Sequence, residues 1–302
     1  MPSSLNSAPV SIRFFIPDDK LKPYISTFYL TEVSPEKGQR LGDWLHPEWA
    51  NLRFTSGEMP IAALGDAEPQ AVPRFSVIGP TSKATWFESG AMRSWGIGLL
   101  PSGWSRFIGM SAELYADRPL DGSTDPATAP MAALHDIIFD GKSMGPVREV
   151  SRISAFLTEA LDRTPPDNPL IAAAHAILID PELRTVQEMA ERLTITGRTL
   201  DRLCRKAFGF PPKLLLQRQR FLRSLAENML NPDQNWVSSL DGQYYDQAHF
   251  GRDFQRFMGM SATEYKALPH PFLNAAVHGR MAAAGAAMQV LHDPAAESDG
   301  ST

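Results

Sequence analysis

Two groups of side chains in the C-terminal half of this 302-residue sequence have the types that can recognise nucleic acid bases. The first group is Arg198, Asp201 and Arg202, and the second runs from Gln247 to Arg252. A guanidinium can form two hydrogen bonds to guanine and a carboxamide two to adenine, and each such pair gives about 1 to 3 kcal/mol of discrimination against the wrong base. This chemistry requires that each group lies on an element narrow enough to enter a groove of the duplex.

The residues around the first group predict two short helices separated by a tight turn. Thr185 to Glu188 is typical of a capping box, in which a Thr hydroxyl and a Glu side chain satisfy free backbone donors, so a helix begins there. The apolar residues of this helix follow the pattern of one buried face: Val186, Met189, Ala190 and Leu193. After a turn at 194–197, a second helix with a basic outer face runs to Gly209. Its inward stripe is Leu200, Leu203, Cys204 and Ala207. This describes a helix-turn-helix, whose second helix can enter a major groove.

The residues from Trp236 to Tyr265 repeat this unit. We expect Val237 and Leu240 to pack its first helix, and Asp246 to cap its second. Three phenylalanines lie on one side of that second helix: Phe250, Phe254 and Phe257. The helix ends at Gly259, and the sequence from Ser261 to Glu264 predicts another capping box that opens a last helix. Between the two units, the residues from Lys213 to Leu230 predict one long helix.

The cations of the chain gather beside these helices. The net charge is −5, but residues 170–268 hold 13 Lys or Arg against 11 Asp or Glu, net +2, which leaves the rest of the chain at −7. The run 198–223 holds eight cations against Asp201 alone. Cation density belongs where phosphates would lie. The sequence therefore predicts that this region faces a nucleic acid backbone.

Individual roles follow from side-chain chemistry. We expect Lys206, Arg218 and Arg256 to contact the phosphate backbone, which fixes register but carries no sequence information. Asp201 cannot approach a phosphate comfortably, so it either accepts a hydrogen bond from cytosine or orients Arg202.

The residues Tyr244 to Phe254, followed by Phe257 to Ser261 and Tyr265, resemble the signature of the AraC/XylS family of bacterial transcription regulators. Residues 196–203, followed by Gly209, are similar to that family's first recognition helix. The resemblance covers residues 170–268, with both units in the right order and spacing. The sequence departs from the family pattern at turn and packing positions: Gln243 where Gly is usual, Ala262 where Pro is usual, and Leu214 to Leu216 where an aromatic residue is expected.

The resemblance implies a sequence-specific DNA-binding transcription regulator. Its two recognition helices would read successive major-groove segments, about one turn or roughly 34 Å apart. By position, six residues match the family's base-contacting positions: Arg198, Asp201, Arg202, Gln247, Ala248 and Arg252. His249 and Gly251 are neighbouring candidates for base contacts. The implied partners are double-stranded DNA, RNA polymerase if the protein is an activator, and in some cases a second copy of the chain.

The rest of the chain divides by composition. Residues 1–10 are rich in Ser, Pro and Asn and are expected to form a disordered arm, while residues 11–162 read as short apolar or alternating strands followed by helices. Three prolines make 163–169 the clearest linker, which separates this β-rich module from the DNA-binding domain at 170–268. Residues 269–302 are expected to form an Ala-rich, partly disordered tail. The fold class is thus α+β, with an N-terminal barrel or sandwich and a C-terminal all-α double helix-turn-helix domain.

The N-terminal module also resembles a known domain. The motifs Trp44 to Pro47, Gly79 to Ser82 and Gly96 to Pro101 are similar to a cupin-like domain of unknown ligand that precedes some AraC-type modules. In that family such domains bind small effectors, mediate dimerisation, or both. The aromatic cluster of this module either lines an effector pocket or simply fills the core: Trp44, Trp49, Phe54, Trp86, Phe87, Trp95 and Trp104.

Motifs of other functional classes are missing from the sequence. There is no nucleophile elbow, phosphate loop or dinucleotide fingerprint, and His46 stands alone near Glu48 where a metal cupin would need several ligands, so we expect no metal, no cofactor and no catalysis. Cys204 is the only cysteine, and no apolar run is long enough to span a membrane. We therefore expect a cytoplasmic regulator. The alternative is a small-molecule-binding or enzymatic cupin-like protein whose C-terminal helices are structural or bind another protein.

Overall fold

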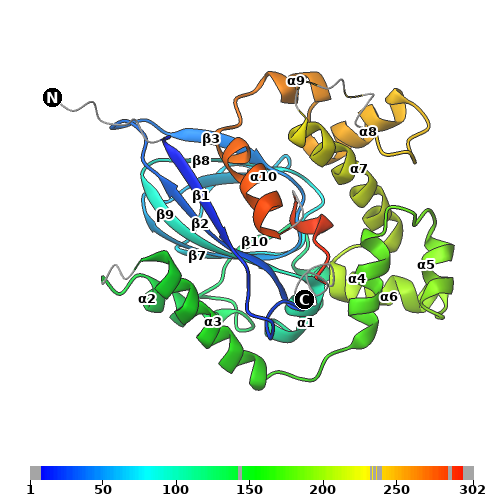
Figure 1. Ribbon diagram of the computed structural model, residues 1–302, viewed down its shortest axis with the longest axis horizontal. Coiled ribbons are helices and arrows are strands. Elements are labelled where there is room, and N and C mark those ends of the chain that lie inside the picture. The colour runs from blue at the N-terminus through cyan, green and yellow to red at the C-terminus, as the bar shows by residue number, and fades with distance from the viewer. Residues whose placement is uncertain are drawn as a thin grey trace.

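The computed structural model of this chain describes residues 8–141, 145–231, 233, 236, 240–284 and 288–294. Two antiparallel β-sheets occupy the N-terminal part, and helices make up most of the C-terminal part (Figure 1). The predicted α+β class is therefore confirmed. Three predicted features lie wholly or partly outside the described residues: the arm at 1–10, the first helix of the second unit around Val237, and the end of the tail at 295–302.

The larger sheet has the strand order β1-β2-β9-β4-β7-β10. Its strands are β1 (Val10–Phe15), β2 (Ile25–Val33), β4 (Asn51–Gly57), β7 (Phe75–Ile78), β9 (Met92–Leu99) and β10 (Pro119–Asp121). The smaller sheet has the order β3-β8-β5-β6, with β3 (Leu41–Leu45), β5 (Ile61–Leu64), β6 (Gln70–Ala71) and β8 (Thr85–Ser89). The sequence pattern does not predict β3, β6 and β10, because they are short or interrupted by Gly, Asp and Pro. The two sheets remain separate, so of the two predicted alternatives, barrel or sandwich, the module is an open sandwich.

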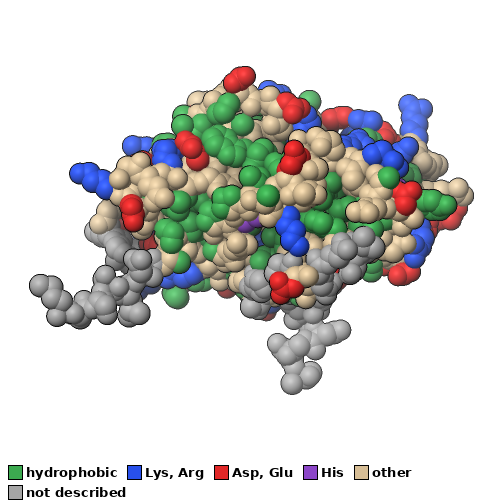
Figure 2. All heavy atoms as spheres, turned by 90° about the horizontal axis from the view of Figure 1, so that it is seen from above, with side chains coloured by type: hydrophobic (Ala, Val, Ile, Leu, Met, Phe, Trp, Pro, Cys, Tyr) green, Lys and Arg blue, Asp and Glu red, His purple; other side chains and the backbone are tan. Residues whose placement is uncertain are grey.

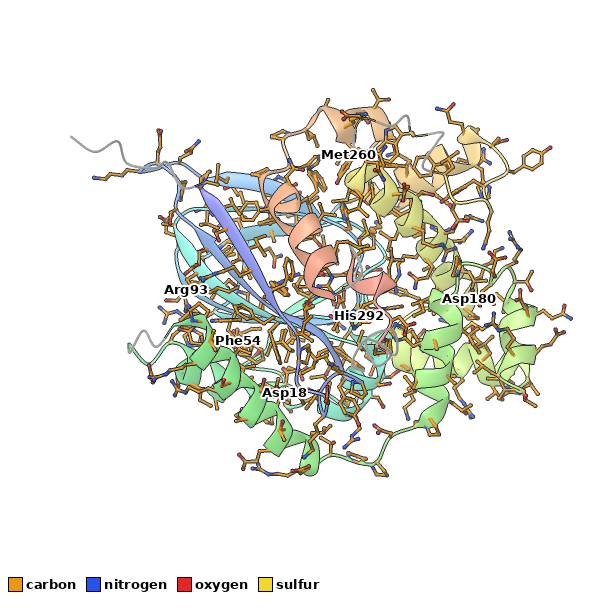
Figure 3. The ribbon with its side chains drawn as sticks, viewed as in Figure 1. Asp18, Phe54, Arg93, Asp180, Met260 and His292 are labelled. Carbon is orange, nitrogen blue, oxygen red and sulfur yellow. The ribbon has the colours of Figure 1, made fainter. Side chains whose placement is uncertain are left out.

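The larger sheet has two chemically different faces. One face carries only large apolar side chains at its centre, among them Phe28, Leu52, Phe54, Val77 and Trp95, all at most 2% exposed. These pack against a helical layer, and Figure 3 shows Phe54 on that side of the sheet. Because side chains alternate along a strand, the intervening residues point the other way, toward the smaller sheet.

The helical layer that covers the apolar face comes from the segments after β9. Its elements are α1 (Pro101–Phe107), η1 (Ala112–Leu114), η2 (Ala129–Ala132), α2 (Ala133–Ile138) and α3 (Pro146–Asp162). Trp104, Leu134, Ile153 and Leu157 supply its buried side chains. After α3, Arg106 holds the predicted linker in place through a 2.7 Å ion pair with Asp167.

The C-terminal helices form a second core. They are α4 (Pro169–Ile179), α5 (Val186–Arg192), α6 (Gly197–Phe208), α7 (Pro212–Leu230), α8 (Gln247–Met258) and α9 (Ala262–Ala267). Their core also includes Trp49, Ala84 and Leu100 of the β-module. In addition, the Ala84 amide donates a 2.7 Å hydrogen bond to the Phe257 carbonyl at the end of α8. The two parts of the chain therefore share buried side chains and backbone bonds.

The C-terminal tail (residues 269–294) returns to the β-module. Helix α10 (Pro271–Ala284) lies along β1 (Figure 1). The buried carboxylate of Asp43 on β3 accepts hydrogen bonds from the Phe272 and Leu273 amides at 2.9 and 3.0 Å, so it caps α10. Beyond α10, η4 (Gln289–Leu291) places Gln289 against the Ala50 and Leu99 carbonyls.

The buried imidazole of His175 on α4 should make folding sensitive to acid. It lies between Trp49 and Phe208 and is 3% exposed, and burial lowers its pKa to about 3. Because its pKa in the unfolded chain is near 6.5, its contribution to stability is complete above pH 6.5 and is lost as the pH falls. Between pH 6.5 and pH 5, the free energy of unfolding of wild type should fall by about 2 kcal/mol more than that of His175→Phe. Urea unfolding at both pH values measures this, and equal losses in the two proteins would contradict it.

Candidate nucleic-acid interface

The first unit positions its basic residues by capping and packing α6. The Thr196 hydroxyl accepts a hydrogen bond from the Thr199 amide, and Gly209 ends the helix at φ +83°. Leu200 and Cys204 are completely buried against α5 and α7, as predicted from their spacing. The turn before α6 contains Thr194 at φ +56°, a left-handed conformation that side chains rarely adopt. A rigid α6 is thus fixed at both ends.

The predicted outer face of α6 is solvent-exposed. Arg198, Arg202 and Lys206 are all exposed. Asp201 is half-buried and accepts a 2.9 Å bond from Arg205 Nε, so it orients Arg205 and not Arg202. Arg205 also pairs at 2.6 Å with Glu113 of η1, which ties the back of α6 to the β-module. The sequence could not predict this second contact of Arg205, because Glu113 lies 92 residues away.

The second unit positions α8 in the same way. The Asp246 carboxylate caps it by accepting a 2.6 Å bond from the His249 amide, and Gly259 ends it at φ +74°. Its inner face packs into an aromatic cluster of Phe221, Phe250, Phe254, Phe257 and Tyr265. The predicted capping box at Ser261 and Glu264 is present and opens α9.

The outer face of α8 presents most of the predicted contact residues. Gln247, Ala248, Gly251 and Arg252 are exposed. Arg256 is also exposed, and its Nη1 donates a 3.0 Å hydrogen bond to Gln217 Oε1 on α7. The view from above in Figure 2 shows Lys and Arg side chains along the end of the molecule that the C-terminal helices form.

His249 faces inward and does not join this outer surface. Arg220 of α7 lies 3.0 Å from His249 Nε2 and pairs with Asp253 at 2.8 Å, and Asp253 also accepts a bond from the Tyr244 hydroxyl. These contacts support a structural role for His249, which holds α8 against α7, in place of the predicted base contact.

The prediction for Arg218 is wrong. Its side chain is 0% exposed, so it cannot reach a phosphate. The guanidinium lies 4.0 Å from the centre of the Trp49 ring, and Nη1 donates a 2.7 Å bond to the Thr81 carbonyl of the β-module. Burial without a carboxylate partner lowers the pKa of Arg218 to about 9. Its position three residues after the buried Leu215 and four before the buried Leu222 is the sequence signal that places it on the inner stripe.

Two further contacts hold the units relative to each other. Gln243, one of the departures from the family pattern, donates to the Pro181 and Leu183 carbonyls at 2.7 and 3.0 Å, next to the start of α5. Arg223 of α7 pairs at 2.5 Å with Asp241, which precedes α8.

Tyr245 lies beside the N-terminus of α8, and its side chain is 93% exposed. Tyr245 is not among the DNA contacts predicted from the sequence.

The β-module contains a cavity between its two sheets. This intersheet cavity of about 550 Å³ is bounded by both sheets and by the C-terminal tail. None of the predicted pocket residues Trp44, Trp49, Phe54, Trp86 and Trp95 lines it. Phe54 and Trp95 point into the helical layer, Trp49 lies in the C-terminal core, and Trp44 and Trp86 pair on the outer face of the smaller sheet. Phe87, named in the same aromatic cluster, does line the cavity.

Ionisable residues near the cavity serve structural contacts. His46 Nε2 lies 2.7 Å from the Tyr265 hydroxyl of α9, and Arg53 pairs with Glu48 at 2.5 Å.

In the C-terminal core, burial raises the pKa of the Cys204 thiol to about 12, which agrees with the predicted position of Cys204 in the core. No group of three or more metal-binding side chains occurs among the described residues, and no helix among them is long and apolar enough to cross a membrane.

Comparison with known proteins gives one family match and several structural similarities. The helix-turn-helix domain family matches residues 189–267. No curated protein sequence matches the chain. Among solved structures, ToxT from Vibrio cholerae is 9% identical with a TM-score of 0.42, over 76% of this chain and 97% of that one. ToxT with a bound unsaturated fatty acid is 9% identical at 0.39, over 78% and 97%. The AraC-like transcriptional activator CuxR is 13% identical at 0.27, over 73% and 88%.

The family match begins within α5 and spans the capped helix α6, the long α7, and the second capped pair α8 and α9. Both helices that carry the exposed cations and Gln247 lie within it. Residues 189–267 of this chain therefore form a helix-turn-helix domain.

Proposed function

We propose that this chain is a DNA-binding transcription regulator that inserts α6 and α8 into two successive major-groove segments. The observation that carries this proposal is the pair of capped helices, each with exposed hydrogen-bonding side chains near its start. Arg198 and Arg202 would read bases from α6, and Gln247, Ala248 and Arg252 from α8. Lys206 and Arg256 would contact phosphates. Because Asp201 holds Arg205, its role at the DNA would be indirect.

The long helix α7 would act as the spacer between the two recognition helices. It packs against both α6 and α8, and Arg220 and Arg223 anchor it to the second unit. Its rigid length would hold the two recognition helices about one DNA turn apart, roughly 34 Å.

The intersheet cavity would receive a small effector. Its volume of about 550 Å³ falls in the range of ligand sites, and its wall includes residues of the tail, which follows directly after α9. An effector that binds one arrangement of tail and helices better than another would shift the population of the DNA-competent state. RNA polymerase and a second copy of the chain are further proposed partners, and the protein would act in the cytoplasm without catalysing a reaction.

A salt titration of DNA binding tests this proposal. Binding of the full chain to upstream genomic fragments should weaken steeply as salt rises, because neutralised phosphates release counterions. With about six phosphate contacts, affinity should fall about 10³-fold between 50 and 200 mM salt. A gel-shift titration at both concentrations, with the same protein preparation, measures the change. Absence of binding, or binding that does not depend on salt, would contradict the function.

A further inference from the structure

The intersheet cavity has walls of opposite character. The larger sheet supplies most of the polar side chains, which are Tyr29, Asn51, Arg53, Thr55, Ser76 and Ser94. The same sheet also contributes Ile12, Phe14, Ile78 and Met92. The smaller sheet and α10 contribute mainly apolar side chains, among them Leu45, Leu64, Phe87 and Phe272. A ligand that fills this space must therefore have a polar end and an apolar body, because either end in the wrong place would leave buried polar groups without partners.

The buried charges of the cavity wall do not cancel. Arg53 is neutralised by Glu48, at 2.5 Å, and its Nε donates to the Tyr29 hydroxyl. Arg280 of α10 adds a second cation that is 7% exposed and has no ion-pair partner among the described residues. Asp121 also borders the cavity but stands exposed on β10. The buried part of the wall thus carries one net positive charge.

The guanidinium of Arg280 is only partly used by the protein. Nη1 donates a 2.7 Å bond to the Thr27 hydroxyl, and the group lies 5.8 Å from the centre of the Phe14 ring. Nε and Nη2 are buried and have no hydrogen-bond partner among the described residues. These two donors lie on one edge of the planar group, which is the fork that matches the two oxygens of a carboxylate. Burial lowers the pKa of Arg280 to about 10, so it stays charged at neutral pH.

We infer that the cavity binds an organic monocarboxylate with an apolar body, and that Arg280 of the C-terminal tail is its counter-ion. The carboxylate satisfies the two free donors of Arg280, while the apolar body lies against the smaller sheet. Because Arg280 belongs to α10, the ligand bonds directly to the tail. This inference rests on the proposed effector role of the cavity and adds the ligand's chemical class and its link to the tail.

Matched pairs of probes test the inference without DNA. Decanoate and 4-phenylbutanoate would be titrated into the full chain by calorimetry, beside decan-1-ol and 4-phenylbutan-1-ol, which keep the apolar body and lack the charge. At least one acid should bind about tenfold or more tightly than its alcohol, as expected for hydrogen bonds to a charged group. Binding of neither acid, or equal binding of acid and alcohol, would overturn the inference.

The variant Arg280→Met assigns the effect to this residue. It keeps much of the packing against Phe14 and removes the charge. It should lose the preference for the acid while binding the alcohol as wild type does, and Arg280→Lys should restore part of that preference. Unchanged discrimination in Arg280→Met would overturn the assignment. Hydrogen exchange of residues 271–284 shows that the tail is folded in each variant. Added acid should slow that exchange in wild type, slow it less in Arg280→Lys, and leave it unchanged in Arg280→Met. If the acids do not bind as expected, the salt-dependent DNA binding is unaffected, so the proposed ligand and the proposed DNA binding are tested separately.

Discussion

Replacing Arg202 and Arg252 together by alanine should abolish most of the sequence-specific DNA binding. Both side chains are exposed on the outer faces of α6 and α8, so neither substitution opens a cavity in the core. A two-bond contact to guanine is worth about 1 to 3 kcal/mol, so the loss of both should weaken operator binding by roughly 30-fold to 10⁴-fold. Binding to random DNA should weaken far less, because most of that affinity comes from phosphates. Gel shifts on the tightest genomic fragment and on random DNA measure the two losses.

Two variants separate base reading from general charge. Arg256→Ala removes a cation of the same helix that we assign to a phosphate, so it should weaken both kinds of DNA by a similar factor. Arg163→Ala removes a highly exposed cation at the end of α3 and should leave both affinities unchanged. If the double variant lost equal affinity for operator and random DNA, base reading by Arg202 and Arg252 would be refuted.

Replacing Asp43 by alanine should release the tail from the β-module. The Asp43 side chain is completely buried and serves three partners in the tail: the His270 ring and the Phe272 and Leu273 amides. Removing one member of such a buried charged network leaves the others without partners and costs about 3 to 5 kcal/mol. We expect this loss in the free energy of unfolding, together with rapid hydrogen exchange at 271–284. Urea unfolding and hydrogen exchange by mass spectrometry measure the two effects.

The charge and the hydrogen bonds of Asp43 can be distinguished. Asp43→Asn keeps one acceptor for the helix amides and should cost less than alanine does. Burial acts against the charged form of His270, but its bond to Asp43 raises its pKa above the ordinary value in the folded protein. That part of the stability is present below pH 6.5 and is lost as the pH rises through the folded pKa, so it should vanish in Asp43→Asn. Asp66→Ala, at an exposed ion pair, should change stability little. An unchanged exchange rate in Asp43→Ala would rule out the capping role.

Local signals were sufficient to predict α5 to α9 of the C-terminal domain. The caps at Thr185, Asp246 and Ser261 and the stops at Gly209 and Gly259 act within one turn of chain, so their residue types define them. The long helix predicted from Lys213 to Leu230 is confirmed as α7 for the same reason.

Predictions about single side chains failed where the partner is distant in sequence. Arg218 looks like one more cation in a basic run, yet its hydrogen-bond acceptor, the Thr81 carbonyl, lies 137 residues earlier. For the aromatic residues Phe54 and Trp95, residue type alone left two alternatives open, a pocket lining and the core. Their strands alternate between two buried faces, so composition could not tell the helical side from the cavity side. The intersheet cavity is instead marked by the small and polar residues between them.

The position of the tail has a consequence for biosynthesis. The last strand of the sheets, β10, is translated about 150 residues before Phe272, which closes the cavity against Phe87. At 5 to 20 residues per second, the ribosome needs about 10 to 30 s to cover that distance. During this interval the nascent sandwich has one side uncovered, and the apolar rings of Phe14 and Phe87 face water. The growing polypeptide therefore completes the helix-turn-helix domain before the tail covers the β-sandwich.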